Sequence, residues 1–127
     1  MLKKIYLFAA LIWTFSILFF CLATFNNLPE IAVKNADKYV HFTFHFGFVM
    51  LWFLYFDFNK QMKTRFKTIF VLFLLSFIFG VAIEIAQKLF TTSRSADVFD
   101  VAANTTGTFI ASLLIVGYIF SRKEISK

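Results

Sequence analysis

Four long apolar segments dominate the pattern of hydrophobic and polar residues along the chain. They run from Ile5 to Phe25, Tyr39 to Phe58, Thr68 to Phe90 and Val98 to Phe120. Each has 20 to 23 residues, and an α-helix needs about 20 residues to cross the hydrocarbon core of a membrane. Lipid offers no partner to backbone N–H and C=O groups, so each segment must satisfy its own. The pattern predicts an all-α integral membrane protein, a four-transmembrane-helix bundle forming a single domain over residues 1–127.

Two of these segments admit a second interpretation. Residues 40–48, "VHFTFHFGF", alternate with the period of two that is typical of a β-strand. A lone strand in lipid would leave its backbone unpaired, so we expect a helix. The first segment follows Lys3 and Lys4, as in a signal peptide. Its apolar run is too long and no clear small-x-small cleavage site follows, so we expect an uncleaved anchor.

Composition and charge agree with a chain in lipid. Hydrophobic residues make up 60% of the chain and charged residues 16%, whereas a soluble domain is about half apolar and a quarter charged. Nine Lys and Arg residues fall at the two termini and between the second and third segments, and four fall on the other side. Cytoplasmic loops carry such an excess, so we expect both termini in the cytoplasm. This asymmetry explains the net charge of +6 without nucleic-acid binding.

Polar residues gather at the predicted outer end of the bundle. Glu84 follows sixteen residues, 68–83, that carry no charge. An ionised group at mid-membrane costs about 3 kcal/mol on insertion scales, so it needs a partner from another helix; Arg94, Lys38 and protonated His41 are the candidates. At roughly 100° per residue, the polar positions that open the second and fourth segments each share one helix face. We therefore expect an outer pocket formed by Asp37, Lys38, His41, Glu84, Gln87, Arg94, Asp97, Asp100 and Asn104.

Some of these residues have simpler explanations. Asp37 and Asp97 stand where helix N-caps are expected, and Asp100 has the spacing of the acidic member of a capping box. An architectural ion pair that joins three helices would also account for Glu84. A separate stripe of small residues at spacing four predicts close helix packing. It consists of Ala103, Gly107 and Ala111.

Metal binding needs separate consideration. His41 and His45 stand at i and i+4, a spacing that can place two imidazoles on one ion, with Glu84 or Asp97 completing the site. The sequence "HFTFH" lacks the glutamate that makes the HExxH motif specific. Cys21 is the only cysteine, which excludes disulfide frameworks and cysteine-rich metal sites. We expect neither a metal ion nor another cofactor.

The ordered set of polar residues resembles the VanZ-like family of small bacterial membrane proteins. It begins with Asp37, Lys38 and His41, and continues over residues 84–107 as E-x-x-Q and R-x-x-D-x-x-D-x-x-x-N-x-x-G. The resemblance covers roughly residues 37–111. The chain has "TTS" where the family often has a proline before the arginine, and Ala111 where a further glycine often follows; His45 lies outside the pattern.

The family takes its name from a member associated with resistance to the glycopeptide teicoplanin, so the resemblance implies a function in the cell envelope. It also implies that the protein is a multi-pass protein of the bacterial cytoplasmic (inner) membrane. We expect a non-enzymatic protein whose outer pocket binds a lipid headgroup or a lipophilic ligand, with Arg94, Lys38 and His41 contacting phosphate or carboxylate oxygens. The expected partners are membrane lipids, a lipid-linked precursor or a lipoglycopeptide. One alternative is a membrane-embedded hydrolase or transferase with His41 as general base, oriented by Glu84 or Asp97. Another is an assembly role, in which the polar residues specify helix packing.

Overall fold

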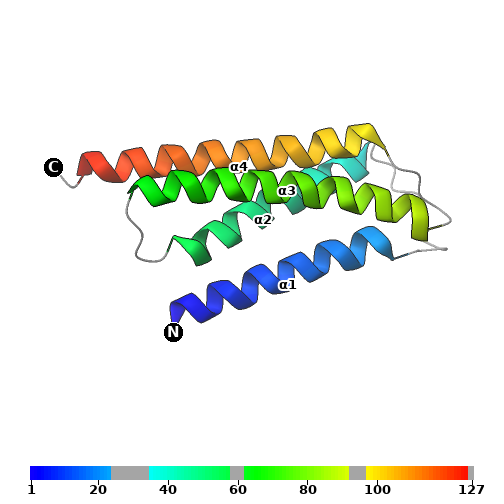
Figure 1. The fold of residues 1–127 in the computed structure, drawn as a ribbon, viewed down its shortest axis with the longest axis horizontal. Helices are drawn as coiled ribbons and strands as arrows, with labels where there is room; N and C mark the ends of the chain where they lie inside the picture. Colours follow the sequence, from blue (N-terminus) through cyan, green and yellow to red (C-terminus); the bar gives the residue numbers. More distant parts are fainter. Residues whose placement is uncertain (24–34, 58–61, 92–96, 126–127) are drawn as a thin grey trace.

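The computed structural model describes residues 1–23, 35–57, 62–91 and 97–125, and these form four long helices (Figure 1). The helices are α1 (Leu2–Leu22), α2 (Ala36–Phe56), α3 (Met62–Phe90) and α4 (Val98–Ile125). Each is long and apolar enough to cross a membrane, and no strand occurs in the described residues. The predicted four-helix membrane fold is confirmed. Residues 40–48 are helical despite their period of two.

The predicted ends of the helices were less accurate. Helix α3 begins at Met62, six residues before the predicted Thr68, and α4 continues to Ile125, past the predicted Phe120. The added residues are mostly polar, and many are Lys, Arg or Glu. These residue types have high helix propensity although they do not belong in hydrocarbon. The apolar segment marks the part of a helix that lies in lipid, whereas the helix itself extends into the aqueous interface.

The four helices run in alternating directions, so both ends of the chain lie at the same end of the bundle (Figure 1). Helices α2 and α3 each contact all three other helices, and α1 and α4 contact only α2 and α3 in the described parts. At the opposite end, the start of α2, the end of α3 and the start of α4 lie together (Figure 1). We call this the polar end, because it holds Asp37, Glu84 and Asp97.

Helix α4 packs closely on α2. Gly107 is buried, and a Cβ atom added there would overlap with the backbone carbonyl oxygen of Phe42. Ala111, one turn further along α4, is fully buried. Without a hydrophobic driving force between helices in lipid, small residues allow the close backbone contact that holds membrane helices together. Helix α1 is joined to α2 differently, since the indole N–H of Trp13 donates to the carbonyl oxygen of Phe44 at 2.9 Å.

Candidate functional site

One lysine connects three carboxylates at the polar end. The Lys38 ammonium group on α2 lies 2.8 Å from Asp37 Oδ2, 2.9 Å from Asp97 Oδ2 and 3.0 Å from Asp100 Oδ1. Asp97 directly precedes α4 and Asp100 is in its first turn. Charge-assisted hydrogen bonds of this length are among the strong ones in proteins. Lys38 therefore fixes the start of α4 against the start of α2.

Two carboxylates accept hydrogen bonds from backbone N–H groups at the start of α4. Asp97 caps the helix, because its Oδ1 accepts the backbone N–H of Phe99 at 2.8 Å. The N–H of Asp97 itself donates to Glu84 Oε2 on α3 at 3.1 Å. Helix N-termini carry unpaired N–H groups and a positive dipole end, which favour such carboxylates. The hydrogen bond from Lys38, with a further one from the Phe99 N–H, lowers the pKa of Asp97 below its ordinary value of 3.8.

The capping interpretation is right for Asp97 and wrong for the other two aspartates. The N-cap of α2 is Asn35, with φ 60° and no side-chain capping bond, while Asp37 lies inside the helix. In a capping box the Asp100 carboxylate would accept the N–H of Asp97. Here Glu84, from another helix, accepts that N–H, and the Asp100 carboxylate bonds Lys38 instead. A three-residue spacing indicates a possible capping box, but a carboxylate from a neighbouring helix can occupy the same place.

His41 lies at the centre of a buried cluster that draws on three helices. Its Nδ1 lies 3.1 Å from Asn104 Oδ1 on α4 and 3.9 Å from Glu84 Oε1 on α3, and its Nε2 lies 3.7 Å from Asp100 Oδ2. We call His41, Glu84, Asp100 and Asn104 the His41 cluster; each is at most 7% exposed. Glu84 Oε1 and Asn104 Nδ2 have no hydrogen-bond partner in the described residues.

A second polar group lies deeper, and the sequence analysis missed it. His45 Nδ1 lies 2.8 Å from the Ser76 hydroxyl, which lies 2.6 Å from the Thr108 hydroxyl. Ser76 occupies the middle of α3. Thr108 follows Asn104 by one turn, so continuing the polar face of α4 would have indicated it. His45 is directed toward Ser76, and it does not share a ligand position with His41.

Three remaining candidates differ in position. Gln87 is buried, but its side-chain amide donates to the Cys21 carbonyl oxygen at 2.9 Å, so it joins α3 to the end of α1 instead of facing the cluster. Arg94 lies outside the described residues. Of the small residues on α4, Ala103 is half-buried, while Gly107 and Ala111 are buried and belong to the contact with α2.

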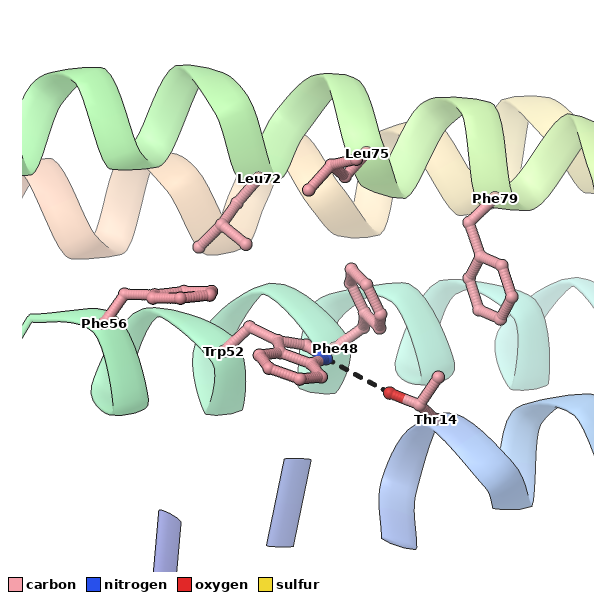
Figure 2. A pocket seen from close by; sticks show the side chains of 7 residues that line it. All are labelled: Thr14, Phe48, Trp52, Phe56, Leu72, Leu75 and Phe79. Atoms are coloured by element: carbon pink, nitrogen blue, oxygen red, sulfur yellow. Dashed lines mark hydrogen bonds between the residues drawn. The ribbon is translucent and has the colours of Figure 1, made fainter. Parts of the chain in front are cut away.

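The bundle also contains an apolar pocket of about 390 Å³. Figure 2 shows that its lining side chains come from α1, α2 and α3, with Trp52 donating to Thr14 Oγ1 at 3.1 Å. Phe48 and Phe79 form one end of the lining, and both rings also pack against His45. The pocket therefore lies next to the deeper polar group.

Comparison with known proteins places the chain in a family. The family model described as VanZ/LLP1 matches residues 2–121. Comparison with curated proteins and with solved structures gave no significant match. The matched region contains α1, which the motif residues did not cover, and extends through almost all of α4. Since the match spans nearly the whole chain, the protein belongs to the VanZ/LLP1 family.

Proposed function

We propose that the polar end binds the headgroup of a lipid or of another lipophilic ligand, at the outer face of the bacterial cytoplasmic membrane and without catalysis. The observation that carries this proposal is Glu84. Its carboxylate is buried in a membrane-spanning helix, and Oε1 lacks a hydrogen-bond partner in the described residues. A buried carboxylate oxygen without a partner is costly, and a ligand that donates a hydrogen bond would remove that cost.

The charges at the polar end favour a particular class of headgroup. Its described residues include four carboxylates, of which three already share the ammonium group of Lys38. Lys38 is therefore not free to receive a phosphate, in contrast to the role expected from the sequence. A headgroup that offers ammonium donors would complement the carboxylates. Phosphatidylethanolamine and amine-bearing lipoglycopeptides have such groups.

The apolar pocket supports an amphiphilic ligand. Two of its lining residues, Phe48 and Phe79, contact the ring of His45. His45 follows His41 by one turn of α2. Polar and apolar surfaces thus follow one another along α2. A ligand with a donor-rich head and an apolar tail fits this order better than a small soluble ligand does. Because the family is named for a member associated with teicoplanin resistance, we propose that this binding contributes to resistance to teicoplanin-type glycopeptides.

Ligand binding can be tested by thermal unfolding of the purified protein in detergent. We expect added phosphatidylethanolamine to raise the melting temperature more than phosphatidylglycerol does, because only the former carries an ammonium group that can pair with the carboxylates. A ligand at a hundred times its Kd stabilises the folded protein by about 2.7 kcal/mol. Teicoplanin is the third probe. Glu84→Gln should abolish the selective response, and Ser76→Ala, a matched buried change deeper in α3, should retain it. Equal responses to all probes, or an unchanged response in Glu84→Gln, would contradict the proposal.

Cells provide the second measurement. Expression of the protein should raise the teicoplanin concentration needed to stop growth, and Glu84→Gln should lose this effect at an unchanged membrane level. A Glu84→Gln protein that fails to accumulate, together with a purified wild type that ignores all three probes, would instead identify Glu84 as a structural residue. That result would favour the assembly role.

The enzymatic alternative has one observation in its favour. His41 is oriented on Nδ1 by Asn104, and its Nε2 faces Asp100, as expected for a positioned general base. The Ser76 hydroxyl pairs with His45 and with the Thr108 hydroxyl. Because these hydroxyls are engaged away from His41, a water molecule would be the nucleophile. Turnover of a lipid-linked precursor by the purified protein, and its loss in His41→Gln, would establish this alternative.

A further inference from the structure

Three side chains of the His41 cluster present ligand atoms toward one another. We propose that His41, Glu84 and Asp100 bind a divalent transition-metal ion such as Zn²⁺ or Mn²⁺. One ligand atom from each residue lies within 4.8 Å of the others, and the three residues come from α2, α3 and α4. Atoms that share one ion at bonds of about 2.1 Å lie roughly 3 to 4 Å apart. Glu84 Oε1 lies 3.9 Å from Nδ1 of His41, so the Glu84 side chain has to turn toward Nε2 to complete the site.

The tautomer of His41 is suited to metal binding. The amide oxygen of Asn104 can only accept a hydrogen bond, so the Nδ1 that lies 3.1 Å from it carries the proton. Nε2 then presents its lone pair on the side of Asp100 Oδ2, 3.7 Å away. Metal-binding histidines commonly donate their other ring N–H to an oxygen acceptor in this way. Asn104 would fix the orientation of the ring without binding the ion.

The carboxylates are arranged so that one oxygen of each remains available. Asp100 Oδ1 pairs with Lys38, while Oδ2 faces His41. Glu84 Oε2 accepts the Asp97 N–H, while the buried Oε1 has no hydrogen-bond partner in the described residues. Two buried carboxylates without full compensation are unfavourable, and a divalent cation would neutralise both. The absence of a partner for Oε1 in the described part of the chain is evidence for a ligand beyond the presence of an acidic cluster.

This site differs from the one that the HxxxH spacing suggests, because His45 bonds Ser76 and contributes nothing to it. His41 and Glu84 are separated by more than forty residues along the chain, so no short sequence motif encodes this site. The inference does not depend on the proposed lipid ligand. The ion and the proposed headgroup would both use Glu84 Oε1, so metal content is measured without added lipid.

The experiment measures metal content in the purified, detergent-solubilised protein. The protein is stripped with a chelator, incubated with Zn²⁺ or Mn²⁺, desalted and analysed by elemental mass spectrometry. We expect about one ion per chain in the wild type and in His45→Gln, the matched control on the same helix. His41→Gln and Glu84→Gln should bind at least tenfold more weakly, since each removes a ligand atom.

Two results would overturn the site. One is a wild-type protein that retains no stoichiometric ion with either metal. The other is an equal loss in His45→Gln and His41→Gln. If His41→Gln does not fold, the electron spin-echo spectrum of the Mn²⁺-loaded wild type decides the question. We expect nitrogen coupling from one imidazole, and a spectrum without it would exclude His41 as a ligand.

Discussion

The two halves of the bundle are held together by different interactions. Toward the chain termini, the buried side chains between helices are apolar, such as Leu72, Ile115 and Ile119. Toward the polar end they are charged or amide groups, such as Glu84 and Asn104. Lipid tails are as apolar as leucine, so apolar contacts join helices only through close packing. A polar side chain is stabilised when it pairs with a polar group of another helix instead of facing hydrocarbon. Such pairs therefore specify which helices meet.

The helices also divide unequally between the two halves. Side chains of α2, α3 and α4 form the polar end, whereas α1 contributes a backbone carbonyl, that of Cys21, which accepts from Gln87. The outer face of α1 carries exposed Phe8, Ile12 and Phe15, as expected for a lipid-facing helix. The comparison indicates a three-helix polar site with α1 as a mainly apolar support.

The largest expected effect lies at the boundary between the halves. Gly107→Val would drive a side chain into the backbone of Phe42 on α2, and overpacking of this kind costs about 3 kcal/mol or more. Gly117→Val is the matched control, because no atom lies within 4 Å of a Cβ added there. Thermal unfolding in detergent measures both. Equal stability of the two variants would show that α2 and α4 are not in close contact.

Removal of Lys38 tests the charged interactions of the polar end. Lys38→Gln leaves Asp37, Asp97 and Asp100 without their shared cation. We expect a loss of about 1 to 2 kcal/mol, below the value for a fully buried ion pair because Lys38 is partly exposed. Lys88→Gln, an exposed lysine near the end of α3, should change stability little. Similar losses in both variants would argue against the three-carboxylate arrangement.

A smaller, pH-dependent effect is expected for Asp97. Its lowered pKa means that the charged carboxylate stabilises the fold above pH 3.8, and that this stabilisation disappears as the pH falls through the lower folded-state value. Asp97→Asn retains the capping oxygen but not the charge. The stability advantage of the wild type should be constant near neutral pH and vanish in acid. A stability advantage of the wild type over Asp97→Asn that grows in acid would contradict this prediction.

The smallest effect concerns the deeper polar group. Ser76 and Thr108 share a 2.6 Å hydrogen bond near the middle of α3, and hydrogen bonds between membrane helices average about 0.6 kcal/mol in double-mutant cycles. A cycle of Ser76→Ala and Thr108→Val should give a coupling energy of that size. A coupling of several kcal/mol would mean that this hydrogen bond, and not apolar packing, dominates the contact between α3 and α4.

The sequence predicted the four helices and the gathering of polar residues because both follow from helix geometry in lipid. It did not predict the individual pairs. Lys38 is one of three candidate partners that the sequence offers for Glu84, but it bonds three aspartates, and Glu84 accepts a backbone N–H. Helical period gives the face on which a residue lies, but the rotation and tilt of the neighbouring helices decide which atoms meet. Ser76 was overlooked because a single hydroxyl scarcely changes the hydropathy of its segment.

The proposed function depends on the polar end facing the outside of the cell, and this can be measured directly. In a Cys21→Ala background, Phe90→Cys places an exposed thiol at the end of α3, and Ser121→Cys places one near the other end of the bundle. A membrane-impermeant maleimide is then applied to intact cells. The account predicts labelling of Phe90→Cys, with Ser121→Cys labelled only after the cells are broken. Labelling of Ser121→Cys alone in intact cells would contradict it.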